Sequence, residues 1–103
     1  MSKELVRLIN SINESVAEFN EFNRDCGYNY PVYFTVDTDT DEKGFDWYFC
    51  KIVWSEDGSV VEVNSNLTLE SAIRGLIRVF DIYVCNDDEF VEWKIQKEVE
   101  YDC

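Results

Sequence analysis

The sequence predicts an α+β fold, in which helices pack against a small antiparallel sheet of three to four strands. The predicted order is α-β-β-β-α plus a C-terminal element that is either helical or a strand. Three observations support it: apolar residues recur at helical spacing in residues 2–26 and 68–84, the segments between them are extended in pattern, and Gly44 and Gly58 lie in the loops that separate those segments.

The first helix is expected to begin after Ser2, whose hydroxyl can cap the free amide groups of the first turn. Cys26-Gly27 is expected to end it. One stripe of this helix is apolar and should face the core, with its members at Leu5, Leu8, Ile9, Ile12, Val16, Phe19 and Phe22.

Three strands are expected between the two helices. Residues 32–37 alternate as in a half-buried strand, and a polar loop over residues 41–44 follows. Residues 45–54 are apolar or aromatic on both faces, which predicts a strand in the middle of the sheet. Glu56-Asp57-Gly58 predicts a tight turn before the returning strand, which contains Val60, Val61 and Val63.

Thr68 is expected to cap a second helix that runs to about Val84, and Asn86 is expected to cap a further element. The segment after Asn86 fits two periods. Apolar and polar residues alternate over residues 91–102, which indicates a strand, whereas Val91, Ile95 and Val99 also keep the i, i+4 spacing of a helix. We predict a short helical turn followed by a strand.

Length and composition predict one folded domain over residues 1–103. Leu, Ile, Val and Phe make up 31 of the 103 residues, well above the roughly 20% below which a highly charged chain stays disordered.

The chain has 22 acids, 9 bases and no histidine, a net charge of −13. This charge argues against direct binding to nucleic acid or to an anionic membrane, because both need a basic surface. It favours a basic partner, such as a protein that holds DNA or RNA; the alternative is that acidity serves only solubility.

Most of the charge lies in two stretches, residues 37–66 and 81–103, each with a net charge of −6. If the backbone stays extended, Asp37, Asp39 and Asp41 point to one side at roughly 6.6 Å intervals. Such a row can imitate a phosphate backbone, although an ordinary polar loop is the alternative. The second candidate row, whose acids could instead stabilise a helix N-terminus, consists of Asp87, Asp88, Glu89 and Glu92.

No metal, cofactor or catalytic site is expected. Residues 37–41 resemble the opening of a calcium-binding loop, but Glu42 and Tyr48 stand where that loop needs a glycine and a bidentate glutamate. Without histidine, the usual acid–base and nucleophilic arrangements are missing. The cysteines lack the spacing of zinc ligands and are expected to be reduced thiols, with Cys50 in the core; they are Cys26, Cys50, Cys85 and Cys103.

Aromatic residues near the acids are candidate binding anchors. Tyr33, Tyr48 and Trp54 alternate with expected core positions, so some of them could be exposed beside Asp37 or Glu56. An aromatic side chain ringed by carboxylates would make a binding hot spot. The alternative is that these rings pack in the core.

A hairpin over residues 52–61, a capped helix over residues 68–80 and the acidic run Asp87-Asp88-Glu89-Phe90 follow one another in this order. In these features the chain resembles the small acidic anti-CRISPR proteins with which phages inhibit RNA-guided type II CRISPR nucleases. The resemblance covers about two thirds of the chain as a pattern. The chain differs in its longer first helix, its many aromatic residues and its four cysteines.

The resemblance implies an acidic DNA mimic that occupies the basic cleft where the nuclease recognises the protospacer-adjacent motif (PAM), and so blocks binding of target DNA. The implied partner is a guide-RNA-loaded CRISPR effector nuclease in the host cytosol during phage infection. The alternatives are a mimic aimed at another DNA-handling protein, such as a restriction enzyme or a repair glycosylase, and a non-catalytic interaction protein whose acidity serves solubility. The candidate contact residues are Asp37, Asp39, Asp41, Glu42, Glu56, Asp57, Asp87, Asp88, Glu89 and Glu92.

Overall fold

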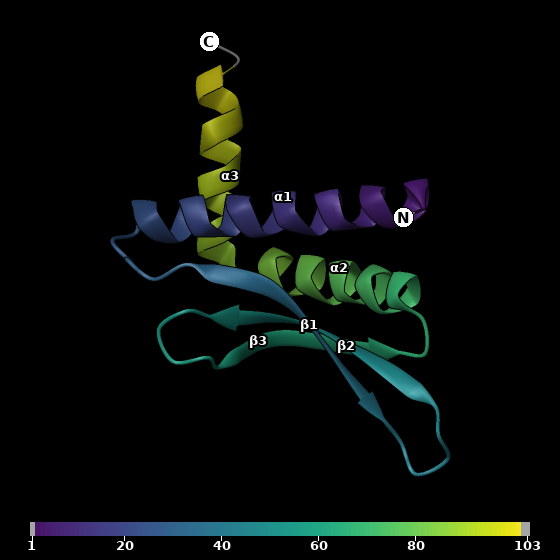
Figure 1. The fold of residues 1–103 in the computed structure, drawn as a ribbon. Helices are drawn as coiled ribbons and strands as arrows, with labels where there is room; N and C mark the ends of the chain where they lie inside the picture. The colour runs from purple at the N-terminus through teal and green to yellow at the C-terminus, as the bar shows by residue number, and fades with distance from the viewer. Residues whose placement is uncertain (1, 102–103) are drawn as a thin grey trace.

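Three helices lie on one side of a three-stranded antiparallel sheet in the computed structural model, which describes residues 2–101 (Figure 1). The expected α+β fold is confirmed. The elements in chain order are α1 (Lys3–Asp25), β1 (Val32–Thr40), β2 (Asp46–Trp54), β3 (Val60–Asn66), α2 (Leu69–Cys85) and α3 (Asp88–Tyr101). None of the helices within residues 2–101 combines the length and the apolar character of a membrane span.

Local signals fix the ends of α1 and α2 as predicted. The Ser2 hydroxyl accepts a hydrogen bond from the Leu5 amide at 3.0 Å, and the Thr68 hydroxyl accepts one from the Ser71 amide at 3.3 Å. Each cap satisfies an amide group that has no partner within its helix. Gly27 follows α1 with a φ of 88°, a left-handed conformation that glycine adopts without strain.

The sheet has the order β1-β2-β3, so the predicted central position of β2 is confirmed. β1 and β2 pair without interruption from Val32 opposite Trp54 to Thr40 opposite Asp46. β2 and β3 pair with one irregularity beside Ile52 and Val53. Because neighbouring residues of a strand point to opposite faces, this register fixes which side chains meet the helices.

The core lies between the sheet and the helices α1 and α2. Phe19 of α1 packs edge to face against Phe80 of α2, with ring centroids 5.6 Å apart. Cys50 is one of the β2 residues under the helices, as predicted, and burial raises the pKa of its thiol to about 11. The side chains with no exposed surface are Ile12, Cys50, Ile52, Ala72, Ile73, Leu76 and Phe80.

Two asparagines fasten the helices to the edges of the sheet. The side-chain amide of Asn20 accepts from the backbone N–H of Val32 at 2.8 Å and donates to its carbonyl at 2.9 Å, which ties α1 to β1. Asn64 of β3 donates to the Ala72 carbonyl at 3.0 Å. Gly75 makes this approach possible, since a β-carbon there would lie 2.1 Å from the Asn64 amide nitrogen.

The C-terminal segment is a continuous helix, so the predicted helical turn followed by a strand is wrong, and there is no fourth strand in the described residues. The predicted cap is also wrong, because Asn86 ends α2 whereas the Asp87 carboxylate accepts from the amides of Glu89 and Phe90. The helix places Phe90 in the core, where its ring packs against Phe22 with centroids 5.3 Å apart. Val91, Ile95 and Val99, whose i, i+4 spacing indicated a helix, lie on its exposed side.

Candidate partner-binding site

The hairpin formed by β1 and β2 extends past the helices at one end of the molecule (Figure 1). All residues from Val36 to Asp46 are exposed except Asp41, which is half-buried. No helix within residues 2–101 covers the side of the sheet that faces away from α1 and α2, and we call this side the open face. The hairpin end of the open face is the candidate site, because the side chains there are not held by the core.

Asp37 and Asp39 lie on the open face, as their spacing predicted. They pair across the strands with Phe49 and Trp47, and all four side chains are on the same side of the sheet. Asp37 forms an ion pair with Lys51 at 3.2 Å, yet its side chain remains 62% exposed. The two carboxylates therefore form a short negatively charged row along an edge strand.

Asp41 does not continue this row as a free charge. Its carboxylate accepts hydrogen bonds from the indole N–H of Trp47 at 2.8 Å and from the backbone N–H groups of Lys43 and Phe45 at 2.9 and 3.0 Å. The bond from Trp47, followed by the bond from Phe45, lowers the pKa of Asp41 below its ordinary value. Asp41 thus shapes the turn and orients the Trp47 ring.

Two aromatic rings complete the site. Trp47 and Phe49 line an open depression of about 230 Å³ together with Asp39 and Asp41. An aromatic face beside a carboxylate suits a guanidinium group, which can stack on the ring and pair with the acid. Neither ring was predicted as a site residue, although the alternation of Trp47 and Phe49 with Tyr48 and Cys50 indicates that they face away from the core.

Two further acids of the hairpin differ in their contacts. Glu42 is exposed in the turn between β1 and β2. The Asp46 carboxylate accepts a hydrogen bond from the Thr40 hydroxyl at 2.6 Å, across the first pair of the hairpin. Of the acids predicted in this region, Asp37, Asp39 and Glu42 are therefore the ones most available to a partner.

Glu56 and Asp57 lie in the turn between β2 and β3, at the opposite end of the sheet (Figure 1). Glu56 accepts a hydrogen bond from the Tyr28 hydroxyl at 2.7 Å. Asp57 accepts from the amide and the hydroxyl of Ser59, and these bonds lower its pKa. The structure gives both acids local roles in holding the turn.

The third group of predicted acids lies at the junction of α2 and α3. Asp87, Asp88 and Glu89 line a surface depression together with Tyr83 and with Glu62 of β3. Burial, followed by the charges of Asp87 and Glu62, raises the pKa of the Tyr83 hydroxyl. Glu92 is exposed one turn further along α3. The ten predicted residues thus fall at two ends of the molecule rather than on one surface.

The three predicted aromatic anchors differ in their burial and contacts. Trp54 packs between Phe19 and Tyr28, with ring centroids 6.0 and 5.2 Å away, so its role is in the core. Tyr48 packs against the core and is half-buried. Tyr33 is 49% exposed on the open face.

Within the described residues, no three metal-ligating side chains come together. The thiols of Cys26 and Cys85 are exposed and unpaired with any described cysteine, and the prediction for Cys103 lies outside the described residues. Comparisons of the chain with family models, with curated proteins and with solved structures gave no match. The function must therefore be inferred from the geometry and charge of the hairpin.

Proposed function

We propose that this chain is a non-catalytic inhibitor that uses the carboxylates of the β1–β2 hairpin to occupy the basic, nucleic-acid-binding surface of another protein. One observation carries the proposal: Asp37 and Asp39 stand in a row on an exposed strand, beside the aromatic depression of Trp47 and Phe49. Carboxylates at strand spacing can take the place of successive phosphates. The rings add contact area that a charged loop alone would lack.

The first target to test is a guide-RNA-loaded type II CRISPR effector nuclease. Support for it comes from the resemblance to anti-CRISPR proteins in the hairpin over residues 52–61, the capped helix over residues 68–80 and the acidic run after it. Such nucleases recognise the PAM with arginine side chains inside a positively charged channel. A guanidinium that normally meets a guanine edge could instead stack on Trp47 and pair with Asp39.

The mechanism would be steric and electrostatic competition. A net charge of −13 speeds the encounter with a basic cleft, and the charge-assisted hydrogen bonds then hold the complex. Because salt screens such interactions, inhibition should weaken as the ionic strength rises. Other proteins with basic DNA-binding clefts, such as restriction enzymes and repair glycosylases, share this chemistry and are the alternative targets.

The test measures binding of labelled target DNA to a purified guide-loaded type II effector in the presence of this protein, at low and high salt. We expect the wild-type protein to reduce DNA binding, and D37N/D39N to lose at least about tenfold in potency, because each lost carboxylate leaves a partner cation unpaired. Both changes keep the size of the side chain and leave Asp41 in place. The matched control is D88N/E92Q, which removes the same charge from the other end of the molecule.

The outcomes separate the target from the site. DNA binding that the wild-type protein leaves undisturbed at both salt concentrations would exclude this effector as the target. Equal loss of potency in D37N/D39N and D88N/E92Q would show that total charge, and not the hairpin, determines inhibition. Loss confined to D37N/D39N supports the hairpin as the contact surface.

A further inference from the structure

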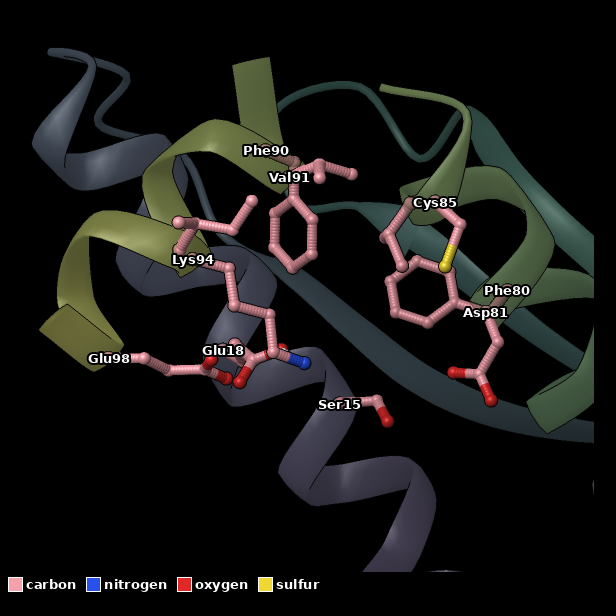
Figure 2. Close-up of a pocket in the computed structure, with 11 residues that line it drawn as sticks. Ser15, Glu18, Phe80, Asp81, Cys85, Phe90, Val91, Lys94 and Glu98 are labelled. Carbon is pink, nitrogen blue, oxygen red and sulfur yellow. The ribbon is translucent and has the colours of Figure 1, made fainter. Parts of the chain in front are cut away.

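A groove between all three helices lies on the side of the molecule away from the open face. It has a volume of about 440 Å³ and is the space shown in Figure 2. Its lining comes from all three helices: Ser15 and Glu18 of α1, four residues of α2 between positions 80 and 85, and five residues of α3 between positions 90 and 98. We call this space the helical groove. Its apolar lining is formed by Phe80, Val84, Phe90, Val91 and Ile95.

An apolar stripe on α3 continues the helical groove. Val91, Ile95 and Val99 follow one another at i, i+4 and i+8, so they lie on one face of the helix. They are 36%, 55% and 55% exposed. α3 reaches away from the rest of the fold beyond α1 (Figure 1), which agrees with the exposure of these three side chains. Contiguous exposed apolar surface of this kind often marks an interaction site.

The rim of the helical groove is negatively charged. Glu18, Asp81 and Glu98 stand around it, and Figure 2 shows their carboxylates beside the Lys94 side chain or across the opening. Lys94 supplies the single basic group among the lining residues, and its ammonium group lies 3.2 Å from the Glu18 carboxylate. The rim therefore carries an excess of negative charge over an apolar floor.

We propose that the helical groove binds an amphipathic helix of a partner protein, with apolar residues on one face and Lys or Arg residues flanking that face. Helices that dock into grooves insert side chains at i, i+3 or i+4, and i+7, a spacing that the stripe from Val91 to Val99 can meet along its length. The basic residues of the partner would pair with Asp81 and Glu98, since Glu18 already pairs with Lys94.

The simplest other occupant of the helical groove is a second copy of this chain, and its negative charge disfavours it. Two copies would bring together two net charges of −13, and the residues around the helical groove would repeat the same negative rim. The negative rim attracts a basic helix and repels a second copy of this acidic chain. The helical groove shares no residue with the hairpin site, so this inference does not depend on the proposed function.

The test uses a fluorescent 14-residue peptide of Leu and Lys, with Leu at helical spacing, and a second peptide of the same composition in scrambled order. Both carry the same charge, so general attraction to an acidic protein affects both equally. Fluorescence anisotropy with the full chain should show at least about tenfold weaker binding of the scrambled peptide, because it cannot present one apolar face.

Two exposed, charge-neutral substitutions complete the test. I95N should weaken binding of the amphipathic peptide by about tenfold, which is the expected loss for removing one apolar contact. V63N, on the open face, should leave binding unchanged; circular dichroism checks that both variants fold. Equal affinity for the two peptides, or equal affinity of I95N and the wild type, would overturn the proposal. A dimer in analytical ultracentrifugation that I95N dissociates would also overturn it, because the groove would then bind a second copy.

Discussion

The two ends of the sheet use similar residues for different purposes. At the end under the helices, the strands supply Cys50 and Ile52 to the core, and the acids of the nearby turns hold the backbone. In the hairpin, β1 carries Asp37 and Asp39. Within the described residues, neither carboxylate caps a helix or holds a turn, and Asp37 pairs with Lys51 of the neighbouring strand. Residues that folding does not need are free to serve binding, which is why the hairpin, rather than the whole acidic surface, is the candidate site.

The comparison also explains why acidic composition alone is a poor guide to function. Asp57 and Asp87 accept hydrogen bonds from backbone N–H groups, and Glu56 accepts a hydrogen bond from the Tyr28 side-chain hydroxyl. A carboxylate that already satisfies local donors has less to offer a partner. Of the predicted acids in the hairpin, Asp41 is used in this way, while Asp37, Asp39 and Glu42 are exposed.

The largest contrast should come from truncating side chains on the two faces of β2. Ile52 is fully buried, and I52A should lower the free energy of unfolding by about 2–5 kcal/mol, because it leaves a cavity. Phe49 is half-buried on the open face, and F49A should cost less than about 1 kcal/mol, the range of a cross-strand pair. Urea unfolding followed by circular dichroism measures both. Similar losses would mean that the hairpin end is part of the core.

A second pair of variants adds one methyl group at each of two positions, and their losses of stability are compared. G75A should cost about 1–3 kcal/mol, because the new β-carbon collides with the Asn64 amide where α2 lies against β3. S65T, next in the strand but on the open face, should change stability very little. In the double variant N64A/G75A, the loss should be smaller than the sum of the two single losses. An additive result would show that Gly75 matters for another reason.

Sequence periodicity sufficed to predict most of the fold. Ser2, Thr68 and the glycine turns mark the ends of their elements, because caps and left-handed turns depend on a few neighbouring residues. Local signals of this kind could not decide whether the segment of α3 is a helix or a strand. Val91, Ile95 and Val99 fit both periods, and the choice depends on Phe90 and Trp93 packing against Phe22, a contact between residues about 70 positions apart.

The candidate site was predicted in its charges but not in its surroundings. The spacing of Asp37 and Asp39 places both on one side of a strand, whatever the rest of the fold does. The neighbouring rings of Trp47 and Phe49 depend on the register between β1 and β2, which the turn determines. The place of the third group of acids, Asp87, Asp88, Glu89 and Glu92, depends on how α2 and α3 meet, and no local pattern contains that information.

A third contrast compares two acids directly. D87A removes the cap of α3 and should cost about 0.5–2 kcal/mol of stability. D39A removes an exposed carboxylate from the open face and should produce no measurable change in unfolding. The matched measurement of DNA competition should show the reverse order, with D39A the more damaging change. If both variants lose stability equally, Asp39 has a structural role and the distinction between the two ends fails.

The smallest expected effect is a difference in pKa between two carboxyl groups that accept similar hydrogen bonds. The indole of Trp47 donates to Asp41 at 2.8 Å in the hairpin, and the indole of Trp93 donates to Asp25 at 2.7 Å between the helices. In both cases the indole is the main cause that lowers the pKa of the carboxyl group below 3.8, the ordinary value. The stabilisation from each ionised carboxylate is therefore complete above that value and is lost as the pH falls through the lowered pKa.

Salt should distinguish the two bonds. The charge of Lys97, whose ammonium group lies 3.5 Å from Asp25, also lowers the pKa of Asp25, whereas only hydrogen bonds lower that of Asp41. Added salt screens the charge and leaves the hydrogen bonds, so the pKa of Asp25 should rise relative to that of Asp41. The two indole N–H signals in nuclear magnetic resonance spectra, followed below pH 5 at low and high salt, report both carboxyl groups, and D41N identifies the Trp47 signal. A titration midpoint of the Trp47 signal at or above 3.8 would contradict the hydrogen bond that orients the aromatic wall of the site.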